Sequence, residues 1–163
     1  MTSLTESLTE MVEIAQSYCR LIEQQGRIPG GWLESLYQLL PQLHSAVTAL
    51  NAYDTGDLPL LEVDLDERFE LYSRLRKQLG ERDSYWLEFD ASPEQLHMSG
   101  SLADDLTDIY FDLKHGLELL DEAWPQRAAQ AWQSSYRAHW GQHLVDAERH
   151  LYALKVRDQL AIN

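Results

Sequence analysis

Apolar residues recur at steps of three and four along most of the chain, which is the spacing of one face of an α-helix. The first apolar stripe comprises Leu4, Leu8, Met11, Ala15, Tyr18 and Ile22. Ser3 and Glu6 have the spacing of a capping box, which predicts the start of this helix. Gly26 predicts its end, because glycine readily adopts the backbone conformation that terminates helices.

The next apolar stripe begins at Trp32 and continues to Leu40, which predicts a second helix. Pro41 follows directly. Because a proline inside a helix removes a backbone hydrogen bond, we expect a break there. A third helix is then predicted from Pro41 to Leu50.

A fourth helix is predicted after Asp64, a good N-terminal cap, and it should end at Gly80. Its expected inner face consists of Leu65, Phe69, Tyr72, Leu75 and Leu79. The segment 81–100 shows no helical period. Its "SYWLEF" run is too short for a helix and favours a turn, a short strand or an aromatic lid.

Two helices are predicted in the remaining third of the chain. One runs from Ser101 to about Leu120, and the other from Pro125 to about Asp158, with Gly141 as its weak point. No repeat or linker divides the sequence. The pattern therefore predicts an all-α protein over residues 1–163, a single-domain bundle of five to six helices with a long C-terminal helix.

The net charge of −14 narrows the classes of partner. Binding to nucleic acid or to anionic lipid requires a basic surface, so we expect neither partner. A protein partner or a homo-oligomer stays open. Cys19 is the sole cysteine, and the N-terminus lacks the pattern of a signal peptide. These features predict a cytoplasmic protein with a buried, structural thiol.

Four aspartates on the predicted helix from Ser101 form an arc beside its leucine stripe: Asp104, Asp105, Asp108 and Asp112. The first two lie near the N-terminus, where carboxylates stabilise a helix through its dipole. The last two lie beyond that range and repel each other one turn apart. Three interpretations remain open, namely a solvated face, hydrogen bonding to a neighbouring helix, or cation binding.

The C-terminal helix carries a second polar stripe with His139, His143, Asp146 and His150. Histidines four residues apart can chelate one metal ion. The zinc-protease motif is excluded, because Trp140 occupies the position after His139 where that motif has glutamate. The alternatives are packing histidines beside the apolar face and acid–base chemistry. If the two stripes meet, the candidate metal ligands are Asp105, Asp108, Asp112, His139 and His143.

Two weaker patterns lie on the predicted helix after Asp64. Glu67 and Glu70, taken with the aspartates, faintly resemble the acid pairs of all-α nucleotide pyrophosphohydrolases, which hold magnesium. A basic segment could meet a phosphate or the acidic face of another subunit, or form a solvated helix end. Its residues are Arg68, Arg74, Arg76, Lys77 and Arg82.

Four stretches together resemble a family of bacterial all-helical proteins known as a domain of unknown function: "YCRLIE", "LYQLLPQL", "GSLADDLTDIYFDLKHGL" and "AWQSSYRAHWGQHLVDAERHLYAL". The resemblance implies a cytoplasmic bacterial protein with one helical domain, and it implies no activity. The residues that resemble the motifs of the family are Asp104, Asp105, Asp108, Tyr110, Asp112, His139, Trp140, Gly141, His143 and Asp146.

Two functional hypotheses follow. The first is a non-enzymatic interaction or accessory module built on an acidic helical bundle, since no complete catalytic motif is present. The alternative is a hydrolase of a phosphorylated or nucleotide substrate that depends on a divalent metal ion, its only expected cofactor. A short distance between the Asp108 or Asp112 carboxylate and His139 or His143 would favour a site.

Overall fold

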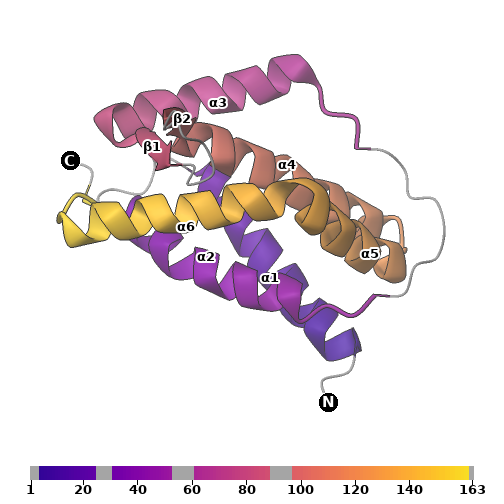
Figure 1. The fold of residues 1–163 in the computed structure, drawn as a ribbon. Helices are drawn as coiled ribbons and strands as arrows, with labels where there is room; N and C mark the ends of the chain where they lie inside the picture. Colours follow the sequence, from indigo (N-terminus) through magenta and orange to yellow (C-terminus); the bar gives the residue numbers. More distant parts are fainter. Residues whose placement is uncertain (1–3, 25–30, 53–60, 89–96, 162–163) are drawn as a thin grey trace.

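The computed structural model describes residues 4–24, 31–52, 61–88 and 97–161. A two-stranded antiparallel hairpin, β1 (Ser84–Glu88) and β2 (His97–Ser101), pairs Ser84 with Ser101. The rest of the regular structure is helical (Figure 1), which confirms the predicted class. The helices are α1 (Leu4–Glu23), α2 (Trp32–Thr48), α3 (Leu65–Leu79), α4 (Leu102–Asp121), α5 (Pro125–Ser135) and α6 (Gly141–Val156).

The predicted long C-terminal helix is confirmed, and it contains a π-helical segment. Helix α5, the segment Tyr136–Trp140 and α6 follow one another without a gap and together contain 32 residues. The Gly141 N–H donates to the Tyr136 carbonyl five residues earlier. A Cβ atom at Gly141 would lie 2.4 Å from that carbonyl oxygen, so a side chain here would collide with the π turn itself.

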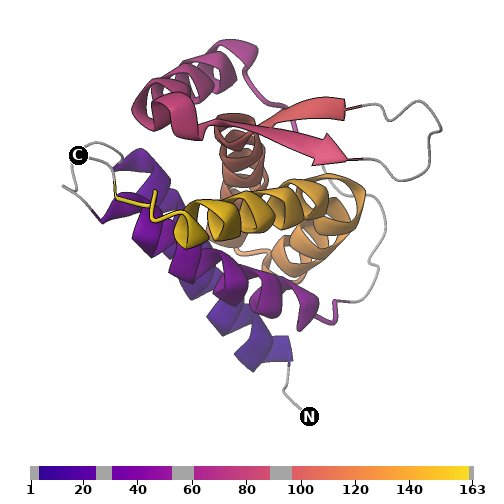
Figure 2. The same cartoon turned by 60° about the vertical axis from the view of Figure 1, so that its left-hand side comes forward.

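Helix α4 lies at the centre of the bundle and packs against α1, α3, α5 and α6 (Figures 1 and 2). Ser101 caps it as predicted, since its hydroxyl oxygen accepts from the Asp104 N–H at 3.2 Å. Asp83 also satisfies this helix end, because its carboxylate accepts from the Ala103 N–H at 2.7 Å and from the Ser101 hydroxyl. The hairpin is thereby fixed to the first turn of α4.

The predicted break at Pro41 is wrong, because α2 runs through it as one helix. Buried residues on both sides of the proline, Leu40 and Leu43, hold the two halves in the core. Pro41 itself is exposed. Water can therefore reach the carbonyl that loses its partner, and packing outweighs the local cost of the proline.

The predicted inner face of the helix after Asp64 is also partly wrong. Leu65 is 77% exposed and Phe69 is 67% exposed, whereas the buried face of α3 carries Leu71, Leu75 and Leu79. Near the start of α3 the side chain directed toward α4 is Arg68, because the surface of α4 opposite it carries Asp104 and Asp108. The cap at Asp64 is confirmed, and Gly80 ends the helix with a positive φ of 57°.

Among the three alternatives for "SYWLEF", the strand is observed over 84–88. The predicted helix boundaries at Ser3 and Gly26 lie outside the described residues. In the part of the chain that the structure describes, no helix combines the length and the apolar character that crossing a membrane requires.

Candidate metal centre

Two of the four aspartates on the acidic face of α4 are buried inside the protein. Asp105 is 3% exposed and Asp112 is 6% exposed, while Asp104 and Asp108 are partly buried. A solvated acidic face is therefore the wrong interpretation. Because burying a carboxylate without partners is costly, the structure must supply donors to these side chains.

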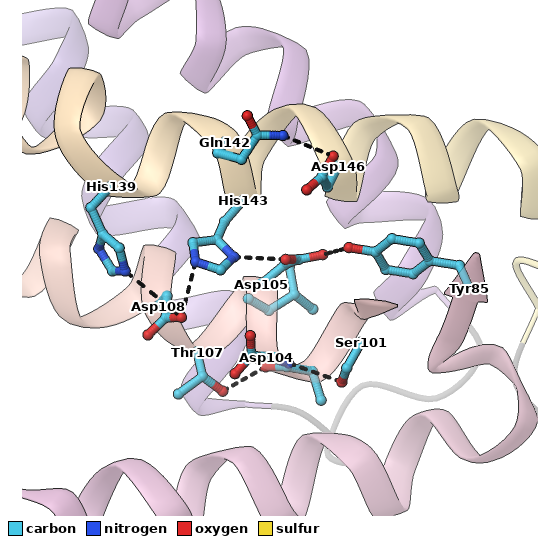
Figure 3. Close-up of polar contacts among 12 residues, drawn as sticks. Tyr85, Ser101, Asp104, Asp105, Thr107, Asp108, His139, Gln142, His143 and Asp146 are labelled. Atoms are coloured by element: carbon cyan, nitrogen blue, oxygen red, sulfur yellow. Dashed lines mark hydrogen bonds and ion pairs between the residues drawn. The ribbon is translucent and has the colours of Figure 1, made fainter. Parts of the chain in front are cut away.

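His143 contacts two of the aspartates, one through a hydrogen bond and one through an ion pair (Figure 3). Its Nδ1 lies 2.7 Å from an Asp105 oxygen, and its Nε2 lies 3.1 Å from Asp108 Oδ2. An ionised carboxylate can only accept, so Nδ1 donates its proton to Asp105, and the ion pair between Nε2 and Asp108 favours the charged imidazolium. Burial lowers the pKa of His143, but the hydrogen bond to Asp105 and the charge of Asp108 outweigh burial and raise it overall.

His139 repeats this arrangement one turn earlier. Its Nδ1 donates to the buried Asp112 carboxylate at 2.7 Å, and its Nε2 lies 3.9 Å from Asp108 Oδ2. The side chain of His139 is 48% exposed, whereas that of His143 is 22% exposed. The two Nε2 atoms thus face one oxygen of Asp108. The four aspartates of the acidic face of α4 and these two histidines form one cluster, and its side at His139 is open to solvent.

The other oxygen of Asp108 is bound by Arg68 of α3. The guanidinium donates to Asp108 Oδ1 at 2.9 and 3.1 Å and to Asp104 Oδ1 at 2.8 Å. Burial lowers the pKa of Arg68, but these two carboxylates raise it overall, so the residue stays charged. The predicted basic segment therefore contributes a residue to the acidic face of its own chain.

Tyr85 of β1 completes the surroundings of Asp105. Its hydroxyl donates to Asp105 Oδ2, while Oδ1 of the same carboxylate accepts from His143. Burial raises the pKa of Asp105 to about 6, outweighing the lowering effect of the hydrogen bonds from His143 and Tyr85. Sequence reasoning missed Tyr85, which does not stand out in the periodicity, and it named Arg68 in the basic segment without pairing it with these aspartates.

The structure brings together all five residues predicted as ligands, but in two different positions. Asp108, His139 and His143 each offer one ligand atom within 4.8 Å of those of the other two, so one ion could share them. The nitrogens that face Asp108 Oδ2 are the two Nε2 atoms. Asp105 and Asp112 instead bind the far nitrogens of the two imidazoles. Carboxylates in this position orient metal-bound histidines in many metal sites.

The observed spacings are close to those of a metal centre. Metal–ligand distances near 2.1 Å place two ligands of one ion about 3.0–3.4 Å apart. His143 and Asp108 meet this range at 3.1 Å, and His139 needs a small movement from 3.9 Å. A second group, Asp104, Asp105 and His143, shares the histidine, but its Nδ1 is already held by Asp105. The first group is therefore the better candidate.

An open pocket of about 400 Å³ lies beside the cluster. It is bounded by the hairpin, α3, α4 and α6, and His143, Asp105 and Asp146 lie in its wall. Asp146 thus lies close to the cluster but is not one of the candidate ligands. The pocket gives a small molecule access to the side of the cluster at His143.

The other residues singled out in the sequence lie elsewhere. His150 faces the hairpin, where its Nε2 donates to the Arg82 carbonyl at 2.6 Å. Glu67 and Glu70 line a separate pocket of about 210 Å³ and do not join the aspartates of the candidate centre. The resemblance to nucleotide pyrophosphohydrolases therefore finds no support, because these two glutamates line a different pocket from the aspartates of α4.

The comparisons with known proteins place the chain in a family. The crystal structure of protein BF1032 from Bacteroides fragilis is similar to it, with a TM-score of 0.75 and 24% sequence identity over 92% of each chain. This likeness shows the fold alone. No curated protein matches the sequence. The family model described as "Domain of unknown function (DUF5063)" matches residues 2–157, so the chain belongs to that family, as the sequence resemblance implied.

Proposed function

We propose that this protein binds one divalent transition-metal ion through His139, His143 and Asp108 and uses it to activate water for hydrolysis. The observation that carries the proposal is the convergence of two imidazole Nε2 atoms on one carboxylate oxygen, Asp108 Oδ2. Two nitrogens and one oxygen suit zinc, manganese or ferrous iron better than calcium.

The charges of the cluster also favour a cation. Four aspartates lie within the cluster and Arg68 is the cation bound between two of them. Without a metal ion, the charged imidazolium of His143 offsets part of the remaining negative charge. A metal ion would replace the proton on His143 Nε2 and bind the Nε2 of His139, while Asp105 and Asp112 hold the protons on the two Nδ1 atoms.

Three protein ligands leave coordination positions for water or substrate, as in catalytic zinc sites. A bound divalent ion lowers the pKa of its water toward neutrality and supplies a nucleophile. His139 is half-exposed, so the free positions can face solvent, and a small substrate can approach the ion from that side. We assign a phosphate ester as the substrate class, because such esters are common substrates of metal-activated water.

Metal titration tests the proposal directly. Chelator-treated protein should bind Co²⁺, Zn²⁺ or Mn²⁺ at one ion per chain, measured by calorimetry and by the Co²⁺ absorption spectrum. Zinc at a hundred times its dissociation constant should stabilise the fold by about 2.7 kcal/mol. For a chain of this size, that raises the melting temperature by about 5–11 °C.

Matched variants locate the ion. His143→Ala and Asp108→Ala should weaken binding at least a hundredfold, whereas His44→Ala should leave it unchanged. His44 is the control because it also bonds a carboxylate, Glu148, at 2.8 Å, and its other nitrogen contacts the Tyr136 hydroxyl and none of the candidate ligands. Loss of 4-nitrophenyl phosphate hydrolysis in His143→Ala tests the catalytic part. Absence of saturable binding, or equal binding in all variants, would refute the metal centre.

A non-enzymatic interaction module is the second candidate. It is favoured by the fact that both nitrogens of His143 already have carboxylate partners in the absence of an ion. In that case the cluster is a buried polar contact between α4 and α6, and its only ligands are protons. The same titration separates the two candidates, because a polar contact alone gives neither a Co²⁺ spectrum nor a thermal shift.

A further inference from the structure

A second pocket, of about 290 Å³, lies between the hairpin and α6. Residues 84–86 of β1 form one wall. The other wall is formed by α6 and the residue that caps its C-terminus. Its residues are Arg149, His150 and Ala153 of the helix and Arg157 directly after it. Figure 2 shows the hairpin alongside α6. None of the three candidate metal ligands lines this pocket.

The charge of this pocket is opposite to that of the whole chain. Both of its charged residues are arginines, and none of its described lining residues is a carboxylate, although the chain has a net charge of −14. Arg149 forms a long ion pair with Asp146, 3.7 Å between the charged atoms and without a hydrogen bond, and its side chain is 55% exposed. The side chain of Arg157 has no hydrogen bond or ion pair within the described ranges.

Arginines present planar arrays of donors that match phosphate and carboxylate groups. Arg68 and Arg82 use their donors within the chain, on carboxylates and on backbone carbonyls respectively. Arg149 and Arg157 instead leave most of their donors available in a pocket wall. An anion is therefore the ligand that this wall can recognise.

The opposite wall is aromatic. The Tyr85 ring stacks on His150 with a centroid distance of 4.8 Å and an interplanar angle of 29°. Trp86, the next residue, is 72% exposed. Flat aromatic surfaces of this kind stack with planar heterocycles, a contact worth about 1–3 kcal/mol per base in single-stranded nucleic-acid complexes. The wall therefore favours a ligand with a planar ring.

His150 adds a neutral acceptor to this wall. Its Nε2 donates to the Arg82 carbonyl, and because a carbonyl only accepts, that nitrogen carries the proton. Burial lowers the pKa of His150, so its Nδ1 is an unprotonated acceptor at neutral pH. The arginines therefore carry all the positive charge in the described lining of the pocket.

We propose that this pocket binds a small aromatic or heterocyclic anion, its charged group on Arg149 and Arg157 and its ring against Trp86. A volume of about 290 Å³ suits a ligand the size of a nucleoside monophosphate or smaller. The site stands apart from the proposed metal centre and does not depend on it. Tyr85 connects the two, because its ring lines this pocket and its hydroxyl binds Asp105.

Calorimetry with three probes in the presence of a chelator tests the site without the metal centre. Adenosine 5′-monophosphate carries both ring and anion, adenosine lacks the anion, and inorganic phosphate lacks the ring. The monophosphate should bind at least tenfold more tightly than either of the other two. No saturable binding of the monophosphate, or equally tight binding of phosphate alone, would overturn the proposal.

Paired variants with equal changes of charge locate the site. Arg149→Gln combined with Arg157→Gln should weaken monophosphate binding at least tenfold. Arg20→Gln combined with Arg137→Gln changes the net charge equally at exposed positions elsewhere and should alter binding less than twofold. Equal losses in the two pairs would show that only overall charge matters and would overturn the assignment.

Trp86→Ala tests the aromatic wall. It should weaken binding of the monophosphate and leave binding of phosphate unchanged. Because Trp86 is largely exposed, the variant should fold, which circular dichroism checks. Unchanged monophosphate binding in this variant contradicts the assigned position of the ring.

Discussion

Replacement of His143 by alanine in metal-free protein measures the contact between α4 and α6. The change removes one imidazole that contacts two carboxylates, since Nδ1 lies 2.7 Å from Asp105 and Nε2 lies 3.1 Å from Asp108. Asp105, at 3% exposure, then keeps only the Tyr85 hydroxyl as a side-chain donor. Asp108 keeps Arg68. The main cost is therefore an under-satisfied carboxylate at Asp105.

The magnitude follows from these contacts. The hydrogen bond to the charged Asp105 contributes about 1.5–3 kcal/mol. The ion pair with Asp108 adds about 1 kcal/mol, so the two contacts bound the loss at about 4 kcal/mol. Water can partly replace the imidazole, because the His143 side chain is 22% exposed, and Asp105 can take up a proton. We therefore expect the free energy of unfolding to fall by about 2–4 kcal/mol. The melting temperature should fall by about 4–16 °C.

The loss should depend on pH in a defined direction. Burial raises the pKa of Asp105 to about 6, so below that pH Asp105 is neutral and the contact no longer joins two charges. On the alkaline side, the raised pKa of His143 means that its stabilising contribution is complete below the ordinary value of 6.5 and is lost as pH rises through the raised value. The difference between wild type and variant should therefore peak between these two limits.

Urea denaturation at several pH values from 5 to 9, with chelator present, provides the measurement. His44→Ala is the matched control. Its contact with Glu148 is more exposed, with side-chain exposures of 36% and 27%, and should contribute about 0.2–1 kcal/mol. If His143→Ala costs no more than His44→Ala at every pH, the argument that the contact is buried and ionic is refuted.

Two further substitutions test how the site is supported. Gly141→Ala places a Cβ 2.4 Å from the Tyr136 carbonyl oxygen, so we expect the free energy of unfolding, measured by chemical denaturation, to fall by about 1–3 kcal/mol. Gly31→Ala, whose Cβ meets no atom within 4 Å, should cost little. Equal losses in the two variants would contradict the role of the π turn. Tyr85→Phe removes one donor to Asp105, so we expect metal affinity to fall about tenfold in calorimetry while the fold is retained. An unchanged affinity would remove Tyr85 from the support of the centre.

Much of the fold was predictable because apolar spacing and helix caps are local signals. Asp64 and Ser101 cap their helices as predicted, since a side chain that accepts from the next turn needs no distant partner. Pro41 was not predictable, because its tolerance depends on burial of its neighbours against other helices. The prediction for Leu65 and Phe69 was wrong because helical spacing alone does not bury a side chain. No apolar surface of another described element covers these two residues, and they are exposed.

The candidate site shows the same division. Spacing along two helices identified the five candidate ligands, because residues three and four apart lie on one helical face. It could not distinguish the Nε2 side of the imidazoles from the Nδ1 side, so Asp108 and Asp105 were given the same role. Arg68 and Tyr85 come from elements more than fifteen residues distant in sequence, and only tertiary packing brings them to the aspartates.

The π-helical segment links the core to the candidate centre. Trp132 and Trp140 are both fully buried although eight residues separate them, which in a regular α-helix leaves them about 80° apart. A π turn holds an extra residue and so rotates Trp140 back toward the core. The same turn contains His139 and directs it to Asp112 on α4. Core packing and the position of a proposed ligand therefore depend on one backbone feature, which Gly141 permits by lacking a side chain.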